Sequence, residues 1–543
     1  MNTLRKIYCR AFQKAFHIAI PFLPYRKPKI AGSVKELPEI IMRHKCTHVL
    51  IITDGGIMKL GLTRRLEKAL KEAGIPYTIY DKTVANPTTV NVREALELYH
   101  KEGCDAIIGF GGGSSMDCAK AVGACAVKPN QSLAQMKGIL KVHKKLPLLM
   151  AVPTTAGTGS ETTLAAVITD ADTRYKYAIN DFPLIPRYAV LDPKVTLSLP
   201  PFITATTGMD ALTHAVEAYI GNSTTIDTRR DALKAVKLIF ENIDIAYEHG
   251  DNIQARRNML HASFYAGCAF TKSYVGYVHA VAHSLGGQYN VPHGLANAIL
   301  LPLVLREYGS CIDKKLHRLA IAAGLADKNT PDHEAAELFI RAIEEMKERF
   351  GIVNIVKEIQ ETDIPKLAHY ADKEANPLYP VPKLMDASEL EKALDEAFTF
   401  EDQAIIERCI IGREFSIAVI EGEALPIIEI APISGFYDYK NKYQPGSTIE
   451  TCPAKLPEET AVRMQRHAEA ACASVGIEGY ARVDFMLDDR TGEDYALEVN
   501  TLPGMTPTSL MPQEAQAIGY SFPQLCEWIL NVSMKKYANT ERN

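Results

Sequence analysis

Four side chains in the middle of the sequence could together bind a divalent metal ion. Asp210 and His214 are four residues apart in an apolar stretch, a spacing that places both on one face of a helix. His279 and His293 follow within the run VHAVAHSLGGQYNVPHG. One carboxylate and three neutral imidazoles suit iron or zinc. An Asp/His pair alone is more often a helix cap or a satisfied hydrogen bond, so the two further histidines favour the metal centre.

An earlier glycine-rich turn could hold a pyrophosphate. The apolar run at residues 106–110 leads into three glycines and then a helix-like segment, GGGSSMD. Glycines let the backbone approach a phosphate closely, and the free N–H groups that begin a helix attract anions. The spacing differs from the GxGxxG dinucleotide fingerprint, so a plain strand-to-helix turn remains the alternative. A second polar turn, PTTAGTGSE at residues 153–161, offers hydroxyls and amides, or is an ordinary capped loop.

Another polar group lies near the C-terminus. Asp484 is in the run ARVDFML, and Glu498 and Asn500 are two apart in LEVN. Residues two apart in a strand point to the same face. Two carboxylates and an amide oxygen on one face suit a hard cation such as Mg²⁺ bound to phosphates. The EVN triplet alone is a weak signal, because an edge strand with outward polar positions gives the same pattern.

Three regions with different sequence patterns surround these groups. Residues 40–195 alternate short apolar runs with longer amphipathic ones, which predicts a mostly parallel sheet with helices on both sides. From residue 201 to about 394, helical periodicity dominates, and all four metal-ligand candidates fall here. After residue 395, closely spaced apolar runs indicate an antiparallel sheet. We expect the chemistry of the metal to take place where the first two regions meet.

Composition favours a soluble intracellular enzyme. The 543 residues are 47% hydrophobic, which is enough for several cores, and the net charge of −5 does not favour nucleic acid as a partner. Eleven cysteines, an odd number without a CxxC pair, indicate reduced thiols and a cytoplasmic location. The apolar N-terminal stretch at residues 11–23 is interrupted by charged residues and prolines, so it is a weak signal-peptide candidate. We expect no membrane association.

Residues 1 to about 395 resemble a complete iron-containing alcohol dehydrogenase. The runs GGGSSMD, PTTAGTGSE, GMDALTHAVEAY and VHAVAHSLGGQYNVPHG match that family in order and spacing. The resemblance implies a metal, Fe(II) or Zn, held by Asp210, His214, His279 and His293. It also implies NAD, whose binding residues would be Gly111, Gly112, Gly113, Ser114 and Asp117 at the pyrophosphate and Thr154, Thr155 and Thr158 at the nicotinamide nucleotide.

Two further roles follow from this resemblance. Asp54 matches the position that faces the adenosine ribose, where a carboxylate accepts a bond from the 2′-hydroxyl and repels a 2′-phosphate, which favours NAD over NADP. A helix N-cap is the alternative for Asp54. His283 lies four residues after His279, and the family places it near the nicotinamide, so we assign it as a proton relay. A structural helix histidine is the alternative for His283.

Residues from about 386 to 535 resemble the C-terminal part of D-alanine–D-alanine ligases, in the ATP-grasp superfamily. The runs GREFSIAV, FYDYKNKY, ARVDFML and LEVNTLPGMTPTSLMP carry this resemblance. It implies that Asp484, Glu498 and Asn500 bind Mg²⁺ and that Glu407 and Glu414 contact adenine and ribose. Lys442 and Tyr443 would lie on a loop that closes over the phosphates. Arg482 and the Gly504 N–H would stabilise the tetrahedral intermediate, and Ser509 and Leu510 would contact the second alanine.

The ligase resemblance is incomplete. The substrate domain of a ligase, and the part of the ATP-grasp that supplies two nucleotide-binding lysines and a phosphate loop, have no counterpart in the sequence. We therefore expect little or no ligase activity from the tail alone, because half of the phosphate charge would lack a partner.

The resulting fold prediction is α/β: a Rossmann-like NAD-binding domain at residues 1–200, an all-helical metal-binding catalytic domain at 201–394, and a partial α+β ATP-grasp domain at 395–543. The favoured function is a metal- and NAD-dependent alcohol dehydrogenase or aldehyde reductase, acting on a small alcohol or aldehyde as a homodimer. Two alternatives concern the tail. It could be an ATP- and Mg-dependent D-alanine–D-alanine ligase for peptidoglycan precursors, or an interaction module whose missing half leaves an apolar sheet face for a partner.

Overall fold

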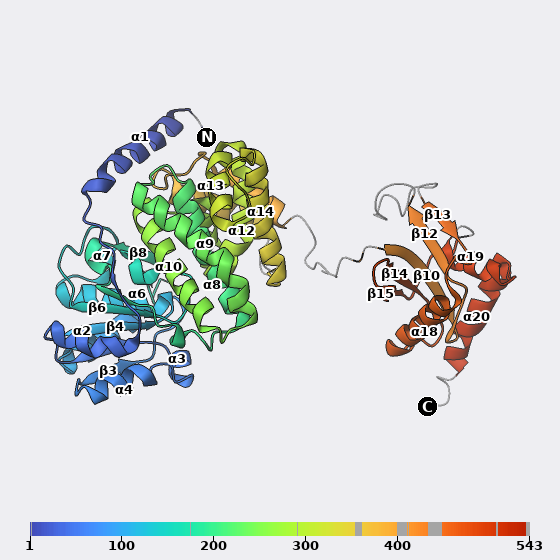
Figure 1. Ribbon diagram of the computed structural model, residues 1–543, viewed down its shortest axis with the longest axis horizontal. Helices are drawn as coiled ribbons and strands as arrows, with labels where there is room; N and C mark the ends of the chain where they lie inside the picture. Colours follow the sequence, from blue (N-terminus) through green and yellow to red (C-terminus); the bar gives the residue numbers. More distant parts are fainter. Residues whose placement is uncertain are drawn as a thin grey trace. The chain divides into compact units, whose positions relative to one another are not determined.

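The chain forms two compact units. The computed structural model describes residues 1, 3–173, 175–289, 291–352, 361–398, 410, 412–432, 448–506 and 509–538. The first unit covers Met1–Ala404 and the second covers Ile405–Asn543 (Figure 1). Each unit has its own sheets and apolar cores, so each is described separately.

The first unit contains a parallel six-stranded sheet in the order β1-β9-β6-β4-β2-β3. Its neighbouring strands pair in parallel throughout. The strands are β1 (Lys29–Ala31), β2 (Val49–Ile52), β3 (Tyr77–Tyr80), β4 (Ala106–Gly111), β6 (Leu148–Pro153) and β9 (Tyr188–Val190). Five of these strands were predicted, from apolar runs at residues 48–53, 77–80, 106–110, 148–152 and 189–191, and they are confirmed with shifts of one residue at their ends; β1 was not predicted. Three of them, β2, β4 and β6, are neighbours, so the turns that follow them meet at one edge of the sheet.

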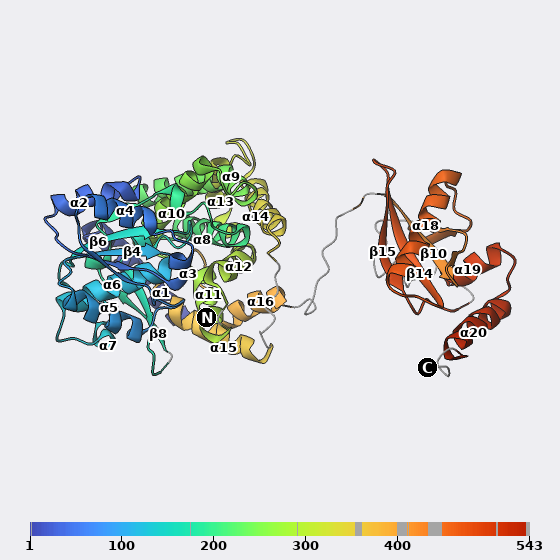
Figure 2. The same cartoon turned by 90° about the horizontal axis from the view of Figure 1, so that it is seen from below.

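Helices cover both faces of this sheet, as predicted (Figure 2). On β2, Val49 and Ile51 pack toward α2 (Leu37–Arg43) and α4 (Arg64–Glu72). Leu50 and Ile52 point the other way and pack with α5, α6 and α7. These three helices are α5 (Thr89–Lys101), α6 (Gly113–Val127) and α7 (Leu133–Met136). Burial on both faces explains why the strand is an unbroken apolar run rather than an alternating one.

A small second sheet was not predicted. It has the order β5-β8-β7 and consists of β5 (Gly138–Ile139), β7 (Ala165–Thr169) and β8 (Lys176–Asn180). Strands β7 and β8 form an antiparallel pair. Its inward residues join the apolar cluster beneath α5 and α6. This hairpin carries Lys176, which matters for the site described below.

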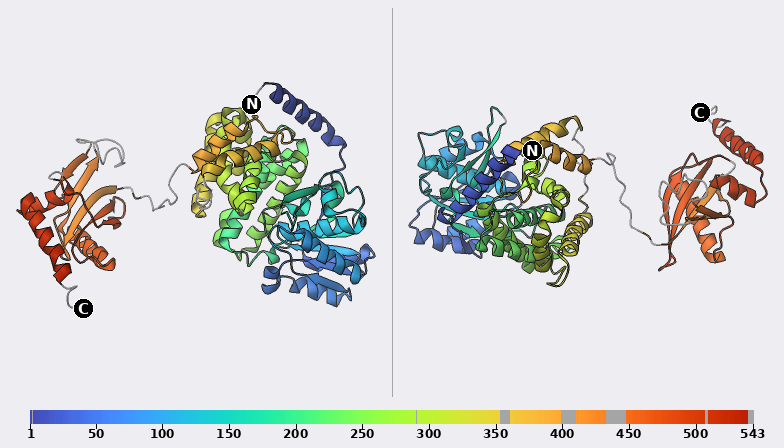
Figure 3. Two further views of the ribbon diagram at one scale, coloured as in Figure 1. Left: turned by 180° about the vertical axis from the view of Figure 1, so that it is seen from behind. Right: turned by 90° about the horizontal axis from the view of Figure 1, so that it is seen from above.

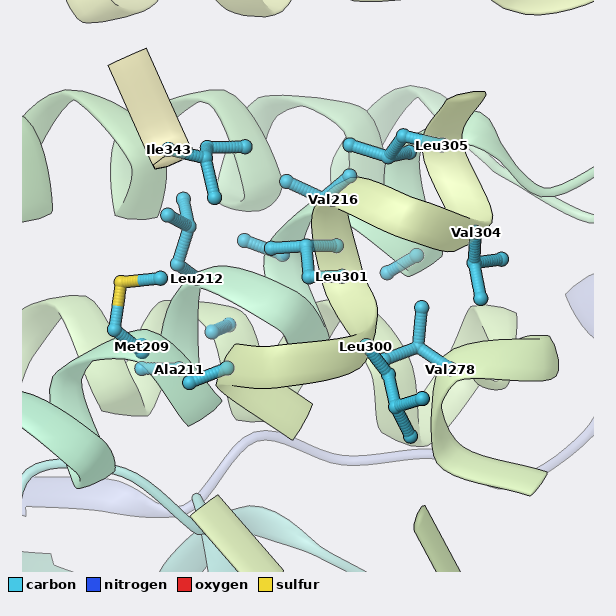
Figure 4. Close-up of a cluster of buried hydrophobic side chains, with 14 of the residues drawn as sticks. Met209, Ala211, Leu212, Val216, Val278, Leu300, Leu301, Val304, Leu305 and Ile343 are labelled. Atoms are coloured by element: carbon cyan, nitrogen blue, oxygen red, sulfur yellow. The ribbon is translucent and has the colours of Figure 1, made fainter. Parts of the chain in front are cut away.

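The second part of the first unit is helical from Pro201 onward. Its helices are α8 (Pro201–Ile220), α9 (Ile226–Glu248), α10 (Ile253–Ser273), α11 (Tyr277–Tyr289), α12 (His293–Tyr308), α13 (Asp313–Ala323), α14 (Asp332–Arg349), α15 (Ile364–Ala375) and α16 (Ala387–Phe398). Helix α8 is buried along nearly its whole length, and Figure 4 shows its Leu212 and Val216 beside Leu301 of α12. The predicted order of a parallel α/β domain followed by a helical domain is confirmed.

Helix α1 (Thr3–Ala19) belongs to the helical part in spite of its position in the sequence. Arg5 pairs with Asp372 at 2.8 Å, and Arg10 donates to the carbonyls of Val381 and Pro382. The N-terminus thus lies beside the segment that precedes α16 (Figure 3). One stretch, His293–Ala323, is long and apolar enough to be tested as a membrane span, but 61% of its apolar window is buried in the protein, as in a core helix.

The second unit has a sheet in the order β13-β12-β10-β14-β15, with β11 paired to β10. Its elements are β10 (Gly412–Ile420), β11 (Glu423–Ala424), β12 (Ile428–Pro432), β13 (Thr448–Thr451), α18 (Glu458–Ser474), β14 (Tyr480–Asp488), β15 (Asp494–Asn500), α19 (Leu510–Ala517) and α20 (Phe522–Ala538). All of these strand pairs are antiparallel, which confirms the predicted sheet type.

Helices cover both faces of β10, the central strand of the second unit. Phe415 and Ile417 pack on α18, whereas Ala418 and Ile420 pack on α19 and α20. The interaction-module alternative rested on an apolar sheet face left bare by the missing half. Within the described residues, helices cover both apolar faces of β10, so the apolar side chains of this strand pack inside the unit.

Helix α16 marks the junction between the two resemblances. Leu390 and Leu394 are fully buried in the core of the helical domain. By packing, the whole of α16 therefore belongs to the first unit, and the division at Ala404/Ile405 lies ten residues beyond the boundary expected from sequence.

Candidate metal and cofactor site

The four predicted metal ligands converge in the helical domain. Asp210 and His214 come from α8, His279 from α11, and His293 is the first residue of α12. One ligand atom from each of them lies within 4.8 Å of all the others. The Asp210 Oδ1 atom is 3.6 Å from His293 Nε2 and 3.9 Å from His214 Nδ1. A carboxylate and three imidazoles at this spacing fit a divalent ion such as iron or zinc.

The constellation is closed on one side and open on the other. The side chains of His214 and His279 are 5% and 3% exposed, and that of Asp210 is 2% exposed. By contrast, the His293 and His283 side chains are 38% and 41% exposed. A small molecule would therefore reach the centre from the side of these two histidines, which is the asymmetry that a catalytic metal site requires.

Burial keeps the ligand imidazoles neutral. It lowers the pKa of His214, lowers that of His279 well below its usual range, and lowers that of His293 to about 4. Each imidazole also disfavours protonation of its neighbours, because their positive charges would repel one another. The neutral form is the one that binds a metal, so the three rings are in the ligating state at neutral pH.

Glu217 orients His279 and was not anticipated from the sequence. Its Oε2 atom lies 2.6 Å from His279 Nδ1, and its two oxygens accept the backbone N–H groups of Gly276 and Val278. Burial raises the pKa of Glu217 to about 7. A carboxylate on Nδ1 places the proton there and leaves Nε2 free to face a metal. Glu217 lies seven residues after Asp210, two helical turns along the same face, and that spacing was the available signal.

His283 lies beside the centre and outside the four-ligand set. Its ring centroid is 5.3 Å from that of His293, and its Nδ1 atom is 2.7 Å from Glu374 Oε1. Burial alone would lower the pKa of His283, but the charge and hydrogen bond of Glu374 outweigh it and raise that pKa. Glu374 in turn accepts a hydrogen bond of 2.6 Å from Tyr379. A half-exposed histidine held by a carboxylate is suited to exchange protons with solvent.

The glycine turn lies at the start of α6. Gly112 is the N-cap residue and provides no capping side chain, so the first amides of the helix are not occupied by a cap. Gly111 has φ +147°, and a Cβ there would lie 2.6 Å from Ser115 Oγ, so this position requires glycine. Ser114 Oγ accepts the Asn86 N–H at 3.3 Å. A helix start with free amides and no side chains in the way is a site for phosphate.

The PTTAGTGSE turn connects this helix start to the metal ligands. Thr154 donates its N–H to the Gly111 carbonyl at 3.0 Å, and Thr158 Cγ2 lies 3.2 Å from where a Cβ of Gly113 would be. At its other end, Gly157 packs so closely on α8, the helix that carries His214, that a Cβ would lie 2.6 Å from the Thr207 carbonyl oxygen. A continuous chain of contacts therefore joins the predicted pyrophosphate site to the metal site.

Two other predicted residues, Thr155 and Asp117, make contacts in this region. Thr155 Oγ1 lies 3.8 Å from where a Cβ of Gly112 would be, on the same side as Thr158. Asp117 accepts hydrogen bonds from Ser160 Oγ at 2.7 Å and from the Val167 N–H at 3.1 Å. Asp117 thus fastens α6 to the second turn and to β7, which is a positioning contact in addition to its predicted cofactor role.

Asp54 caps a helix and also faces the glycine turn. Its Oδ1 atom accepts the N–H groups of Gly56 and Ile57 and caps α3 (Gly55–Lys59), which is the alternative derived from the sequence. Its Oδ2 atom faces the glycine turn and accepts from Ser115 Oγ at 3.4 Å. One oxygen is therefore used by the helix, and the other points toward the predicted nucleotide site.

Lys176 is a second residue that sequence reasoning missed. Its Nζ atom donates to Asn86 Oδ1 at 2.7 Å, and Asn86 also contacts Ser114. Burial lowers the pKa of Lys176, and the charges of Asp117 and Glu374 counteract this. The positive charge of Lys176 disfavours protonation of both His283 and His293. The sequence offered no signal for it, because the β8 hairpin was not predicted.

In the second unit, the predicted magnesium residues lie on facing strands. Asp484 of β14 is opposite Glu498 of β15, and Arg482 is opposite Asn500. The hydrogen bonds of Asp484 differ from those of a metal ligand, because the Arg482 guanidinium donates to both of its oxygens, at 2.9 and 2.8 Å. Ser416 also donates to Asp484 at 2.9 Å. The carboxylate best placed for Mg²⁺ is thus already neutralised by an internal cation.

The remaining predicted residues of the tail are spread around this pair. Ser509 Oγ would be 3.0 Å from a Cβ at Gly504, and Leu510 begins α19 in a small apolar cluster with Ile428. Glu414 lies on β10 opposite Ile430 and Met486. The other three, Glu407, Lys442 and Tyr443, lie outside the described residues.

Glu514 was not predicted and lies beneath the Arg482–Asp484 pair. It is fully buried, and its Oε2 accepts the Ala418 N–H. Burial raises its pKa well above the usual range, and the Asp484 charge adds to this. In its neutral form, Glu514 packs against β10 without adding a negative charge to this buried region.

These features define a class of protein: a nucleotide-type α/β domain joined to a helical domain with a buried Asp/His₃ metal centre. Family comparison agrees, because residues 30–193 match the iron-containing alcohol dehydrogenases and residues 204–398 match the C-terminal domain of that family. The chain belongs to the iron-containing alcohol dehydrogenase family. Residues 381–531 match the C-terminus of D-ala D-ala ligases, so the chain is a fusion of the two.

Individual relatives give the same result. The 1,3-propanediol dehydrogenase of Citrobacter freundii is 37% identical over 389 residues, covering 71% of this chain and 99% of the relative. The NAD-dependent methanol dehydrogenase of Bacillus methanolicus is 36% identical over 355 residues, 64% of this chain and 92% of the relative. All of this similarity is confined to a part of the chain that matches a whole dehydrogenase in length.

Solved structures resemble the same part. A 1,3-propanediol oxidoreductase superposes with a TM-score of 0.66 at 37% identity, covering 69% of this chain and 99% of that one. The sulfoacetaldehyde reductase of Bifidobacterium kashiwanohense, solved in complex with NAD⁺, has a TM-score of 0.62 at 26% identity, covering 69% and 99%.

Proposed function

We propose that the chain is a metal- and NAD-dependent alcohol dehydrogenase that interconverts a short primary alcohol or diol and its aldehyde. One observation carries the proposal: the contacts that run from the glycine turn through Thr158 and Gly157 to α8, the helix that carries Asp210 and His214. They support placing the two reacting centres, nicotinamide and metal, next to each other. The buried Asp/His₃ set fits Fe(II) or Zn and does not by itself choose between them.

When bound, the metal would supply the Lewis acidity that lets the alcohol hydroxyl lose its proton while the carbon that bears it gives a hydride to nicotinamide. The chain's own residues do the rest. Asp210 and the three imidazoles hold the ion, and Glu217 fixes the His279 ring so that Nε2 faces inward. His283 moves the hydroxyl proton toward solvent. Because Glu374 holds its Nδ1, the other ring nitrogen is the one that exchanges the proton.

NAD is the proposed cofactor on two grounds. The Asp54 Oδ2 atom, which does not cap the helix, faces the glycine turn, where it would accept a ribose hydroxyl and repel a 2′-phosphate. In addition, the methanol dehydrogenase relative is described as NAD-dependent, and the sulfoacetaldehyde reductase was solved with NAD⁺. Comparing kcat/KM with NAD and NADP tests this; a preference for NADP would contradict it.

The substrate class is proposed from the relatives. Four relatives at 35–38% identity are named for 1,3-propanediol, methanol or 1-propanol, all short primary alcohols. The deciding experiment is aldehyde-dependent NADH oxidation by the full chain, loaded in turn with Fe²⁺ and Zn²⁺, over a panel of C1 to C6 primary alcohols and diols. Turnover that needs neither metal, or that is confined to secondary alcohols, would contradict the proposal.

For the tail we propose an accessory role without ligase activity. The Arg482–Asp484 pair occupies the carboxylate that the ligase resemblance assigns to Mg²⁺. The test is phosphate release by the full chain with ATP, Mg²⁺ and D-alanine, beside the NADH assay as a positive control. D-alanine-dependent release would move the ligase alternative into the function. The cytoplasmic location is proposed from ten described cysteines that are all free thiols.

A further inference from the structure

Asn297 lies at the centre of the metal ligands and was not anticipated from the sequence. It is on α12, one turn after His293, and is completely buried. Its Nδ2 atom donates to Asp210 Oδ1 at 2.7 Å. The same nitrogen is 3.1 Å from His279 Nε2 and 3.2 Å from His293 Nε2. One amide nitrogen therefore contacts three of the four ligand atoms.

The orientation of this amide follows from the chemistry of its neighbours. An ionised carboxylate such as Asp210 only accepts hydrogen bonds, so it requires the N–H side of the amide. His279 carries its proton on Nδ1, against Glu217, so its Nε2 is also an acceptor. The Asn297 Oδ1 atom is turned away and has no hydrogen-bond partner among the described residues.

In this buried amide, the nitrogen contacts three acceptors while the oxygen has no partner among the described residues, and such an imbalance needs an explanation. Four ligand atoms within 4.8 Å of one another bring a negative charge and several lone pairs to one point. Without a positive charge these acceptors repel one another and lack donors. The N–H group of Asn297 is the one donor that the described residues aim at three of them.

We propose that Asn297 is a placeholder for the cation: its amide holds Asp210, His279 and His293 together before a metal enters, and the metal must compete with it. The proposal rests on the proposed metal centre. It predicts that Asn297 stabilises the metal-free chain more than the loaded chain, so that removing the amide strengthens metal binding while weakening the empty site.

The test is calorimetric unfolding of the full chain with and without metal, comparing the wild type with Asn297→Leu, which has similar volume and no donor. The melting temperature of the chelator-treated variant should fall, and that of the Zn²⁺- or Fe²⁺-loaded variant should fall less. In a Zn²⁺ titration the affinity should rise about tenfold, the equivalent of losing one competing hydrogen bond to a charged group.

Asn297→Asp provides an independent route if the leucine variant folds poorly. It keeps the shape and replaces the donor by an acceptor 2.7 Å from Asp210, so the empty site should be weakened further and the metal-induced shift should grow. Asn242→Leu is the matched control. Asn242 is also buried and hydrogen-bonded, to Leu238 and Asn258, but on α9, so it should lower both melting temperatures equally.

The outcomes distinguish a failure of the proposed metal centre from a failure of the placeholder role of Asn297. If the wild type shows no melting shift with either metal, the metal centre itself fails. If the wild type shifts but Asn297→Leu lowers the empty and loaded forms equally, or lowers the loaded form more, the placeholder role is overturned, and Asn297 is then a packing residue or an aid to the loaded site.

Discussion

The two units treat their carboxylates in opposite ways. Asp210 in the first unit is surrounded by neutral imidazoles and one amide, and no described Lys or Arg pairs with it. Asp484 in the second unit is also buried, but Arg482 binds both of its oxygens. The first carboxylate needs a cation from outside, whereas the second already has one. Burial of an acidic residue is therefore no guide to metal binding until the charges around it are known.

The helices explain why the first unit supplies a complete set of metal ligands. Its ligands come from α8, α11 and α12, all within one core, and Glu217 and Asn297 of the same helices orient them. In the second unit, Glu498 lies on β15 at the edge of the sheet and is exposed. An edge strand with a bare acidic residue lacks the enclosing wall that strengthens electrostatic interactions.

The strongest test of this contrast removes one residue from each site. His279→Ala should reduce NADH oxidation by more than the roughly 10- to 100-fold cost of losing a residue that only orients a ligand, because a ligand itself is lost. Asp484→Ala should leave NADH oxidation unchanged, since it lies in the other unit. Steady-state rates with saturating Fe²⁺ measure both. Equal losses would mean that the two units share one site.

Breaking the internal ion pair of the second unit should act on stability alone. Arg482→Met leaves Asp484 buried and unpaired, which costs about 3–5 kcal/mol in the unfolding of that unit. Arg482 and Asp484 are 8% and 7% exposed, so solvent does little to screen the loss. Two-transition urea unfolding, with dehydrogenase activity as the probe of the first unit, separates the effects. A double variant, Arg482→Met with Asp484→Leu, should recover most of the stability.

Glu217→Gln should weaken the first site without removing a ligand. The amide would turn an N–H toward His279 or toward the backbone donors of Gly276 and Val278, so the ring would lose its fixed tautomer. We expect metal affinity to fall about 10- to 100-fold. A Zn²⁺ competition titration measures it, and full activity should return at high metal concentration. Unchanged affinity would show that helix packing alone orients His279.

The proton relay should be visible in the pH dependence of alcohol oxidation. His283 must be neutral to accept a proton, and Glu374 raises its pKa, so kcat/KM should rise with pH through an inflection above 6.5. Glu374→Gln removes the negative charge and should move that inflection to lower pH. His283→Ala should abolish it, with a smaller loss of turnover than His279→Ala. A profile identical to the wild type in both variants would leave His283 with a structural role.

The smallest effect is expected from removing the second unit. Truncation after Ala404 follows the division between the units and keeps Leu390 and Leu394 of α16 in the helical core. We expect kcat and KM for alcohol and NAD to match those of the full chain. Truncation before α16 is the matched contrast, because it exposes a buried apolar face and should destabilise the first unit. Loss of activity in both truncations would give the tail a role in the dehydrogenase.

Sequence patterns located the elements well where burial dictates them. The unbroken apolar runs of β2 and β4 and the apolar periodicity of α8 led to the correct elements, because strands covered on both faces and buried helices must be apolar. The β5-β8-β7 sheet was missed, because short polar strands such as Lys176–Asn180 give no comparable signal. Lys176 was missed with it.

The residues of the site also fall into those that the sequence indicated and those that only the fold revealed. Residue types and spacing were enough to select Asp210, His214, His279 and His293, since one carboxylate and three histidines in two apolar helix-like runs are a typical iron or zinc ligand set. Tertiary structure decided what surrounds them. Glu217 and Asn297 lie on the ligand helices α8 and α12, but only packing brings them against His279 and Asp210 of the neighbouring helices. Glu374 lies on α15, which only packing brings to the centre, and only the structure shows that Arg482 neutralises Asp484. A sequence specifies which ligands are present, whereas the fold decides which charges they face, because charges interact through space rather than along the chain.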